Sequence, residues 1–426
     1  MDIVVIGCGA GGATAAQFAR KHDRNATITV FEKGSYPQYS KCALPWVLSG
    51  ELTPEAVIEL SKDWFDKNNI NLHLKTAIEH VDLKDKFVVA NDEISRYDML
   101  IIATGASPFS PVKPRGRTFF LRTLEDVKAI DHASKMSTSA LIVGGGMIGL
   151  ETADALHRRG MDVTIIEYLA NPLLGTIDSD ISIEVRKRIS GIKMHFNHKI
   201  TKIDDRDGMI VTAIDEQNRN VTFSADIVVI ATGNRPNIDL VPDLARQAIV
   251  VNKQCQTMNK SVYAVGDCTQ YKDIVGNDVV SGLGSIAVRQ AMVAGENAVG
   301  GNATMPSIVA ARTTEIFGVE IAGVGPTSMQ LPFRPVSGKV IGKTRPKYMP
   351  SETVLVKVLA DTNGTIIGAQ AVGPAAAQRI NKFAVAVQTG MNLTSFIEIE
   401  TAYAPTVAPM IDASTMACKI AKRRLQ

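Results

Sequence analysis

The sequence predicts an α/β protein with two Rossmann-like dinucleotide-binding domains and a C-terminal α+β domain. Three observations carry this prediction. A glycine-rich turn, Gly7 to Gly12, follows an apolar run at the start of the chain, and a second, Gly144 to Gly149, follows another apolar run. From about Met305 the pattern changes to a β-hairpin followed by a helix. Because each glycine turn leads from a strand into a helix, the duplication indicates two nucleotide-binding domains.

The bulk composition is that of an ordinary globular protein. The chain has 426 residues, of which 45% are hydrophobic and 21% are charged, and its length suggests roughly two to four domains. The net charge of +3 is too small to indicate binding to nucleic acid or to an acidic membrane surface. No signal-peptide pattern is visible, and no apolar stretch reaches the length of a membrane span. We therefore expect a cytoplasmic protein without nucleic-acid or membrane partners.

The first glycine turn lies in a complete strand–helix–strand pattern. Residues 3–6 are typical of a buried parallel strand, residues 12–20 of a helix, and residues 27–32 of the next strand. Gly7, Gly9 and Gly12 would let the backbone approach a pyrophosphate at the helix N-terminus. Glu32 follows Gly12 by about 20 residues, where a ribose hydroxyl needs an acceptor. We interpret these four residues as a cofactor site, with a tight turn that binds nothing as the alternative.

The second glycine turn repeats this pattern. A strand at residues 140–143 precedes it, a helix is expected over residues 150–159 with Glu151 at its start, and a strand at residues 162–167 follows. Gly144, Gly146 and Gly149 are the cofactor-binding candidates. A carboxylate at Glu167 would accept from the 2′-hydroxyl of NAD and repel the 2′-phosphate of NADP. Residues 168–171 contain no arginine to hold that phosphate, so the sequence favours NADH over NADPH. The alternative is that Glu167 is a solvated strand end.

Two further strands end in the same three residues. Residues 99–105 and 227–233 are apolar runs that finish in Ala-Thr-Gly, which adds Thr104, Gly105 and Gly233 to the cofactor-binding candidates. A later strand at residues 261–265 leads into Gly266 and Asp267. We interpret that segment as returning to complete the first domain. The expected boundaries are 1–110 and 237–303 for the first domain, 111–236 for the second and 304–426 for the C-terminal domain.

The C-terminal domain is expected to contain a β-hairpin. Its strands are residues 354–359 and 365–370, joined around Asn363-Gly364, and a helix over residues 375–389 follows.

The cysteines are scattered along the chain. There is no CxxC pair, so the sequence indicates neither a zinc site nor a disulfide framework, and we expect no metal. Cys42 stands beside Lys41 and just before a helix that Pro45 helps to start, where a helix dipole would favour a thiolate. A small buried hydrophobic residue is the alternative, and the local sequence leaves both open. We expect Cys8 to be inert and Cys268 to be a buried structural thiol.

Taken together, these features resemble the two-dinucleotide flavoprotein disulfide reductases, the pyridine nucleotide-disulfide oxidoreductase family, over nearly the whole chain. Residues 257–267 are similar to the second FAD motif of that family, whose aspartate, here Asp267, binds the ribityl chain. Residues 42–45, Cys-Ala-Leu-Pro, resemble the active-site segment of the single-cysteine branch, closest to the coenzyme A-disulfide reductases. NADH oxidases and peroxidases of that branch usually carry a histidine where this chain has Ala10. Lys41 and Met147 depart from the residues common in the family, asparagine and tyrosine.

The resemblance implies an enzyme and assigns roles to residues. FAD would bind the first domain, with Gly266 and Asp267 among its contacts, and NADH the second. Cys42 would be the redox centre that reduces coenzyme A disulfide or a related small disulfide or polysulfide, and coenzyme A would be substrate or bound thiol. The resemblance also implies a homodimer. In it, Tyr403 of the partner's copy would serve as proton donor, Tyr348 would be a second catalytic tyrosine, and Glu151 would lie near flavin and nicotinamide. Arg20 and Lys21 are candidates for the coenzyme A phosphates.

Three alternatives remain open from the sequence. The first is an NADH oxidase that cycles Cys42 through sulfenic acid. The second is an electron-transfer reductase for a protein carrier, in which Cys42 has no role. The third is a flavin-binding redox sensor with negligible turnover.

Overall fold

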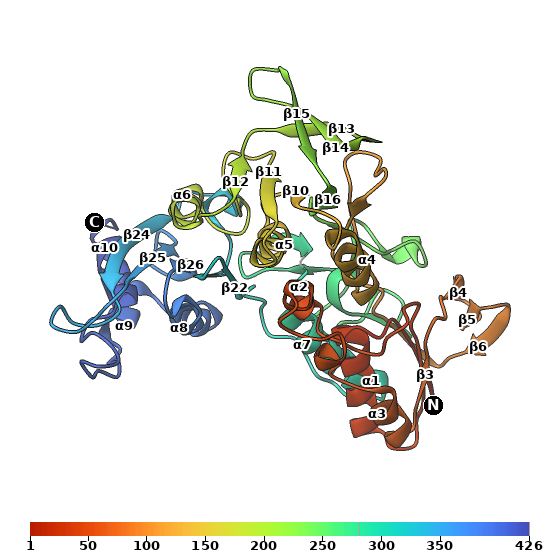
Figure 1. The fold of residues 1–426 in the computed structure, drawn as a ribbon. Helices are drawn as coiled ribbons and strands as arrows, with labels where there is room; N and C mark the ends of the chain where they lie inside the picture. Colours follow the sequence, from red (N-terminus) through yellow and green to blue (C-terminus); the bar gives the residue numbers. More distant parts are fainter. Residues whose placement is uncertain (281, 426) are drawn as a thin grey trace. The chain divides into compact units, whose positions relative to one another are not determined.

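The computed structural model describes residues 1–280 and 282–425 and divides the chain into two compact units. Unit 1 comprises residues 1–47, 51–108 and 234–308. Unit 2 comprises residues 48–50, 109–233 and 309–426; we call residues 109–233 its central lobe and residues 309–426 its C-terminal lobe. Figure 1 labels some of the elements of each unit. The domain boundaries expected from the sequence stay predictions.

Unit 1 is built on a five-stranded parallel sheet in the order β19-β7-β1-β2-β3. Its strands are β1 (Asp2–Ile6), β2 (Thr27–Phe31), β3 (Ile70–His73), β7 (Met99–Ile102) and β19 (Val262–Ala264). Ile3 and Val5 belong to the core that includes residues of α1 (Ala10–His22) and α7 (Gly284–Ala298), whereas Val4 and Ile6 belong to a second core. Because β1 buries both of its faces, its sequence is a continuous apolar run.

Smaller elements complete unit 1. Three strands form an antiparallel meander, β4 (His80–Asp82), β5 (Phe87–Ala90) and β6 (Glu93–Arg96). The late segment adds the sheet of β18 (Ile249–Val250), β20 (Thr269–Lys272) and β21 (Asp278–Val280). β8 (Ala106–Pro108) pairs antiparallel with β17 (Asn234–Pro236). The short helices are α2 (Leu44–Ser49), which continues into residues of unit 2, and α3 (Lys62–Lys67).

The central lobe of unit 2 repeats the parallel design. Its sheet has the order β12-β11-β10-β16-β9 and consists of β9 (Thr118–Phe119), β10 (Ser139–Val143), β11 (Asp162–Ile166), β12 (Lys193–His195) and β16 (Ile227–Ile230). The helices are α4 (Leu124–Ser134), α5 (Met147–Arg158) and α6 (Ser179–Arg188). An antiparallel meander of β13 (Lys199–Arg206), β14 (Gly208–Ile214) and β15 (Asn220–Ala225) adds to the core of this lobe. The glycine turn joins β10 to α5, as the first one joins β1 to α1.

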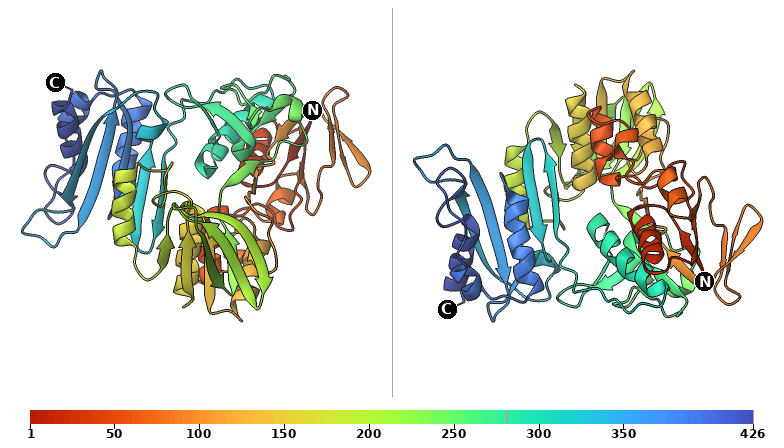
Figure 2. Two further views of the ribbon diagram at one scale, coloured as in Figure 1. Left: turned by 90° about the horizontal axis from the view of Figure 1, so that it is seen from above. Right: turned by 90° about the horizontal axis from the view of Figure 1, so that it is seen from below.

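The C-terminal lobe is an antiparallel sheet with helices against it. The strand order is β22-β23-β26-β25-β24, for β22 (Arg312–Ile316), β23 (Val319–Val324), β24 (Val336–Lys343), β25 (Thr353–Ala360) and β26 (Ile366–Val372). The helices are α8 (Ala376–Gln388), α9 (Leu393–Glu398) and α10 (Ala413–Arg423). The blue helices lie against the blue strands in Figure 2. At Gly338 the strand β24 comes so close to α10 that a Cβ atom would overlap the carbonyl oxygen of Ala417.

A buried polar network joins the two lobes of unit 2. Lys357 on β25 places its ammonium 2.7 Å from Asp178 and 2.7 Å from Asp180, at the start of α6. Asp178 also accepts from the backbone N–H and the hydroxyl of Ser328, at 2.7 and 2.8 Å. Lys339 adds a second cation, 2.8 Å from Asp180. Since removing one partner of a buried ion pair is strongly destabilising, these contacts hold the lobes in register.

No helix among residues 1–280 and 282–425 is long and apolar enough to cross a bilayer. The same residues contain no group of three or more His, Cys, Asp and Glu side chains arranged to hold a metal ion.

Candidate functional site

The first glycine turn is folded tightly around its own backbone. Gly7 has a φ of +101°, and a Cβ atom there would overlap the carbonyl oxygen of Ala103. A Cβ atom at Gly12 would overlap the carbonyl oxygen of Gly7. By contrast, the space that a Cβ would occupy at Gly9, the residue before α1, is open. The turn thus leaves room beside the helix N-terminus, as a bound pyrophosphate requires.

Glu32 is held beside this turn by the backbone. Its Oε2 accepts from the N–H of Cys8 at 2.7 Å, and its Oε1 accepts from the N–H of Gly34 at 2.7 Å. Each carboxylate oxygen can accept a second hydrogen bond. A ribose hydroxyl would therefore meet a carboxylate that is already oriented.

The second glycine turn has the same geometry. Gly144 has a φ of +112°, and Cβ atoms at Gly144 and Gly149 would overlap the carbonyl oxygens of Ala231 and Gly144. The space at Gly146 is open, as it is at Gly9. Glu167 accepts from the backbone N–H groups of Gly145, at 2.5 Å, and Leu169, at 2.7 Å.

The helix after the second turn begins earlier than the sequence predicts. We expected residues 150–159, but α5 begins at Met147, with Gly146 as its N-cap and its carbonyl accepting from the N–H of Leu150 at 3.0 Å. Glycine is among the residues favoured at the N-cap, so the helix can begin directly after Gly146. The first helical turn therefore contains residues that look like part of the glycine loop in the sequence. Glu151 consequently lies inside the helix, beyond its first turn, rather than at its start.

In each unit, the other cofactor-binding candidates follow the strand that pairs with the strand before the glycine turn. Thr104 and Gly105 directly follow β7, and Thr104 exchanges hydrogen bonds of 2.8 Å with Asn237. Gly233 follows β16, with a φ of +104° and open space around it. The carboxyl ends of parallel strands, where these residues lie, form the usual ligand-binding edge of such a sheet.

The turn of Gly266 and Asp267 follows β19 and is fixed by hydrogen bonds with two buried side chains. The N–H of Gly266, whose φ is +80°, donates to Oε1 of Gln290 at 2.8 Å. The hydroxyl of Thr269 donates to the carbonyl oxygen of Gly266 at 2.7 Å. Gln290 and Thr269 are themselves fully buried, so the turn that carries Asp267 has a fixed shape. Gln290 could not be recognised from the sequence, because a glutamine inside a helix carries no signal of such a role.

Cys42 is exposed, so it is not the small buried hydrophobic residue that one interpretation of its local sequence expected, and its redox role stays a prediction. It lies in a 3-10 turn, Lys41–Ala43, immediately before α2. The four other thiols, Cys8, Cys255, Cys268 and Cys418, are buried. Burial raises the pKa of Cys8, Cys255 and Cys418 to about 12 and also raises that of Cys268. Because the thiolate is the reactive form, thiol chemistry in this chain points to Cys42.

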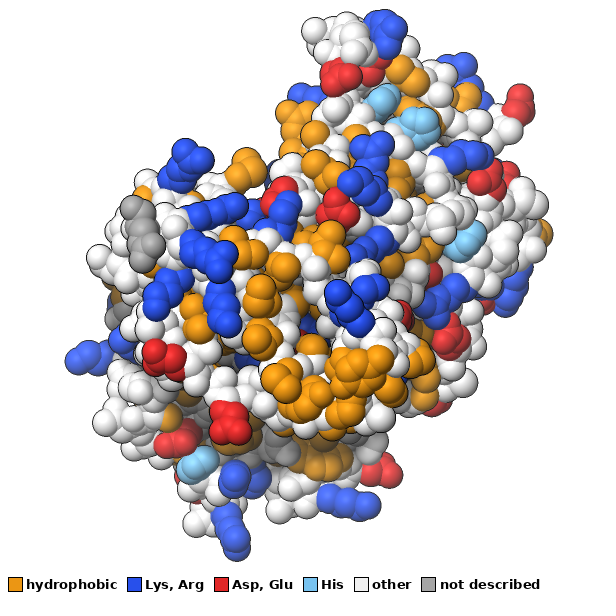
Figure 3. All heavy atoms as spheres, turned by 90° about the vertical axis from the view of Figure 1, so that its left-hand side faces the viewer, with side chains coloured by type: hydrophobic (Ala, Val, Ile, Leu, Met, Phe, Trp, Pro, Cys, Tyr) orange, Lys and Arg blue, Asp and Glu red, His pale blue; other side chains and the backbone are white. Residues whose placement is uncertain are grey.

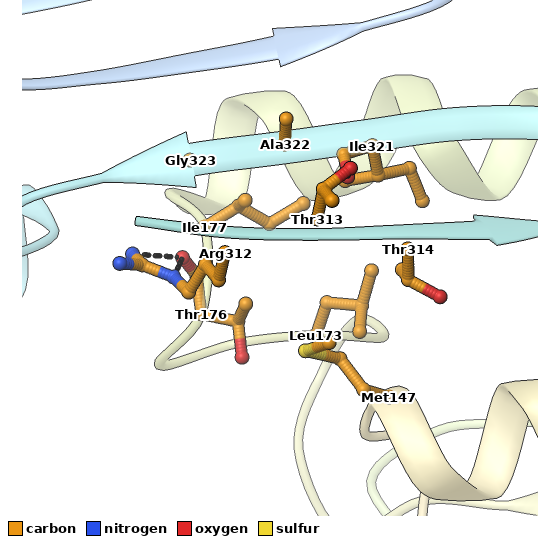
Figure 4. A pocket seen from close by; sticks show the side chains of 10 residues that line it. All are labelled: Met147, Leu173, Thr176, Ile177, Arg312, Thr313, Thr314, Ile321, Ala322 and Gly323. Atoms are coloured by element: carbon orange, nitrogen blue, oxygen red, sulfur yellow. Dashed lines mark hydrogen bonds between the residues drawn. The ribbon is translucent and has the colours of Figure 1, made fainter. Parts of the chain in front are cut away.

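Glu151 is partly buried and contacts the C-terminal lobe. The hydroxyl of Thr314 on β22 donates to its Oε1 at 2.5 Å. Burial raises the pKa of Glu151, and this hydrogen bond lowers it in part. A small pocket lies beside the contact, between the first turn of α5 and the strands β22 and β23 (Figure 4). Its lining is Met147, Leu173, Thr176, Ile177, Arg312, Thr313, Thr314, Ile321, Ala322 and Gly323.

The two predicted tyrosines meet each other. The hydroxyl oxygens of Tyr348 and Tyr403 are 3.2 Å apart, although the residues are separated by 55 positions. Both side chains are exposed, and the hydrogen bond with Tyr403 raises the pKa of Tyr348. Further exposed apolar residues of the C-terminal lobe include Val407, Met410 and Ile411. In Figure 3, which shows the side of the molecule at the left of Figure 1, hydrophobic side chains gather beside lysines and arginines.

Arg20 is already engaged within unit 1. Its guanidinium donates to the backbone carbonyls of Asp23, Arg24, Asn68 and Asn69, at 2.8–3.2 Å. The expectation that Arg20 binds coenzyme A phosphates stays a prediction, and these carbonyl contacts do not support it. Lys21 lies over the ring of Phe18, 5.3 Å from its centroid.

Comparisons with known proteins cover almost the whole chain. Residues 1–296 match the family described as "pyridine nucleotide-disulphide oxidoreductase", and residues 311–414 match its dimerisation domain. An NADH oxidase of Methanocaldococcus jannaschii is 30% identical over 100% of this chain and 99% of its own length. An NAD(P)H coenzyme A polysulfide/persulfide reductase of Pyrococcus horikoshii is 28% identical over 99% of this chain and 98% of its own.

The solved structure of an NAD-dependent persulfide reductase from A. fulgidus has the same fold. Its TM-score is 0.93 at 28% identity, and the alignment covers 100% of this chain and 83% of the other. The predicted fold class, two Rossmann-like domains followed by a C-terminal dimerisation domain, is thus confirmed.

Proposed function

This chain belongs to the pyridine nucleotide-disulphide oxidoreductase family, and we propose that it reduces coenzyme A disulfide or a related small disulfide or polysulfide with NADH, through Cys42. The resemblance inferred from the sequence is confirmed, and the chain is an FAD-dependent NAD(P)H oxidoreductase. The observation that carries the proposal is that Cys42 is exposed while the four other thiols are buried.

The residues of unit 1 fit FAD. The overlap of a Cβ at Gly7 and at Gly12 with the backbone, and the open space at Gly9, leave the cradle that a pyrophosphate needs. Glu32 would hold the ribose hydroxyls, Asp267 the ribityl chain, and Thr104 and Gly105 would lie at the same sheet edge. When bound, FAD supplies a two-electron carrier between a nicotinamide and a thiol.

The central lobe would hold the nicotinamide cofactor. Gly144, Gly146 and Gly149 would bind its pyrophosphate, with Gly233 at the neighbouring strand end. Glu167 supports NADH over NADPH, because its carboxylate would accept from a 2′-hydroxyl and repel a 2′-phosphate. Glu151 would act beside the nicotinamide.

The thiolate of Cys42 would attack one sulfur of the substrate disulfide. A bond forms between Cys42 Sγ and that sulfur, the substrate S–S bond breaks, and one thiolate leaves. The leaving thiolate takes a proton, for which Tyr403 of a second copy in the homodimer is the proposed donor, and Tyr348 would hold its hydroxyl. Two electrons from NADH then cleave the mixed disulfide, so one NADH and one proton convert one disulfide into two thiols.

Intact mass before and after reduction tests the proposal. We expect the purified protein to lose the mass of coenzyme A when it is treated with dithiothreitol, and Cys42→Ser to show no such loss. Cys418→Ala, which removes a buried thiol, is the matched control and should behave as the parent protein. A protein that carries no coenzyme A and that fails to turn over coenzyme A disulfide, other small disulfides and polysulfide would refute the proposal.

An NADH oxidase is the second candidate. The relative from Methanocaldococcus jannaschii bears that name at 30% identity, and an exposed thiol can cycle through sulfenic acid. Oxygen uptake compared with anaerobic turnover of coenzyme A disulfide separates the two activities. NADH consumption that requires oxygen and ignores the disulfide would favour the oxidase.

A further inference from the structure

The contact between Glu151 and Thr314 joins parts of the chain that lie 163 residues apart. Glu151 lies on α5, the helix that begins at the second glycine turn, and Thr314 lies on β22 of the C-terminal lobe. The distance of 2.5 Å between the hydroxyl and Oε1 makes it a short, direct hydrogen bond.

The strand β22 and Phe317, the residue that follows it, contact the central lobe at three places, and Thr314 makes the middle contact. Arg312, two residues before it and therefore on the same face of the strand, donates to the carbonyl oxygen of Thr176 at 2.6 and 3.1 Å. The N–H of Phe317 donates to Asp154 at 3.0 Å. In Figure 4 the side chain of Thr314 points to the same side as Met147 of α5, whereas that of Thr313 points away.

The charged groups around Glu151 are engaged elsewhere. On its own helix, Asp154 pairs with Arg158 at 3.1 Å. On β22, Arg312 also donates to the carbonyl oxygens of Ala310 and Gly325, and Glu315 is exposed on the opposite face. Burial and the hydroxyl of Thr314 set the pKa of Glu151, the first raising it and the second lowering it. The hydroxyl is thus the group that orients this carboxyl and stabilises its ionised form.

We propose that Thr314 is a positioning residue for the NADH half of the reaction: it fixes the carboxyl of Glu151, so that a strand of the C-terminal lobe completes the site of the central lobe. The inference rests on the role proposed above for Glu151. It implies that the C-terminal lobe does more than present a dimer surface.

Four variants of the holoenzyme and one control test this inference. The variants are Thr314→Val, Thr314→Ser, Glu151→Gln and the double variant Thr314→Val/Glu151→Gln. The control is Thr313→Val, which removes a hydroxyl from the other face of the same strand, where it bonds the carbonyl of Ile321 at 3.0 Å. The first measurement is the rate of flavin reduction by NADH without oxygen and without disulfide. The second is the thermal unfolding midpoint at pH 5 and at pH 8.

We expect Thr314→Val to slow flavin reduction about tenfold or more, the effect of losing a hydrogen bond to a charged group. Thr314→Ser should restore the rate, and Thr314→Val should add nothing to Glu151→Gln. The raised pKa means that Glu151 destabilises the fold once pH exceeds its ordinary range. Thr314→Val should therefore lower the unfolding midpoint more at pH 8 than at pH 5, and this difference should vanish in the double variant.

The outcomes separate this inference from the proposed function. A slow Glu151→Gln with a normal Thr314→Val would overturn the inference alone. A loss in Thr314→Val that persists undiminished in the Glu151→Gln background, or that Thr313→Val reproduces, would show a merely structural role and overturn it too. A normal rate in Glu151→Gln would overturn the inference together with the role of Glu151, while leaving the chemistry of Cys42 untouched.

Discussion

The two glycine turns of this chain are near copies with different surroundings. The first glycine has a φ of +101° in one and +112° in the other, and the last glycine of each would clash with the first if it had a Cβ atom. In both, a glutamate at the end of the next strand accepts two backbone N–H groups. The scaffold for a dinucleotide is therefore the same twice over.

What differs is the element that packs against each helix. α1 packs against α7 of its own unit, so closely at Gly295 that a Cβ atom would overlap the carbonyl oxygen of Ala15. α5 instead carries Glu151, which Thr314 of the C-terminal lobe holds. Under the proposed function, the glycine turns would supply cofactor binding, and the chemistry of each half-reaction would come from residues outside them.

The largest expected effect falls on the thiol alone. Cys42→Ser should lower disulfide reduction by on the order of 10³-fold or more, since it removes the nucleophile. The rate of flavin reduction by NADH should change by less than about twofold, because neither glycine turn is touched. Stopped-flow absorbance of the flavin and a thiol-release assay measure the two halves. Retained disulfide turnover would instead favour a carrier-linked reductase.

Removing the Tyr403 hydroxyl should slow only the disulfide half of the reaction. Tyr403→Phe is expected to slow disulfide reduction by about 10²-fold, the usual contribution of a general acid. NADH-driven flavin reduction should stay unchanged. Tyr348→Phe should have a smaller effect on the same step, because it removes only the partner of Tyr403. Equal losses in both half-reactions would indicate a folding defect rather than a lost proton donor.

Adding one methyl group to each glycine turn should show that the two turns bind different cofactors. Gly12→Ala and Gly149→Ala both force a Cβ atom onto a backbone carbonyl. We expect Gly12→Ala to weaken FAD binding, and Gly149→Ala to weaken NADH binding, by about 10- to 100-fold, the effect of overpacking a tight contact. Bound flavin is read from absorbance and NADH affinity from titration. If either variant lost both cofactors equally, the turns would not be independent sites.

Glu167 should set the choice of nicotinamide. Glu167→Ala is expected to reduce the preference for NADH over NADPH by about tenfold, because a hydrogen bond to the 2′-hydroxyl and a repulsion of the 2′-phosphate are lost together. Glu167→Gln, which keeps an acceptor without charge, is the matched control and should lose mainly the repulsion. The ratio of kcat/KM for the two cofactors is the measurement. An unchanged ratio would mean that Glu167 is only a strand end.

The smallest expected effect is on stability and concerns Asp226 and Asp98, which precede corresponding strands of the two parallel sheets. Asp226 accepts from the backbone N–H and the hydroxyl of both Thr138 and Ser139, and these bonds lower its pKa to about 2. Asp98 holds the equivalent position in unit 1, just before β7. Of the corresponding hydrogen bonds it accepts only the one from the backbone N–H of Asp2. The stability that Asp226 contributes is present above the ordinary aspartate pKa and is lost as pH falls toward 2.

We therefore expect Asp226→Asn to reduce stability at pH 6 by less than about 1 kcal/mol, since the group is partly solvated. The difference from the parent protein should shrink at pH 3, and Asp98→Asn should cost less still. Urea unfolding at the two pH values measures both. A pH-independent loss would mean that packing, rather than charge, is at stake.

The sequence was sufficient for features whose cause is local. A glycine turn between an apolar strand and a helix needs small residues at fixed positions, so both turns and their acids could be placed from the sequence. The start of α5 was placed too late, because Met147 and Ile148 look like loop residues until the cap at Gly146 is known.

Contacts between distant segments could not be predicted. Nothing in the residues around Thr314 or Glu151 indicates that they meet, and the same holds for Gln290 beneath Gly266. The exposure of Cys42 was open for the same reason: it depends on which elements cover the turn, and that is decided by tertiary packing. The carbonyl contacts of Arg20, which the resemblance offers as a candidate for the coenzyme A phosphates, are likewise set by tertiary packing and could not be predicted.

The lysine at position 357 sets a limit on engineering this protein. Its two aspartates lie at the start of α6, in the other lobe, and Arg312 and Thr314 reach the same lobe nearby. Replacing residues 309–426 with those of a homologue would remove Lys357 and leave the carboxylates of Asp178 and Asp180 without this cation, unless the homologue has a lysine at the same position. Exchanging residues 109–233 alone would break the same contacts, so the two lobes of unit 2 would have to be exchanged together.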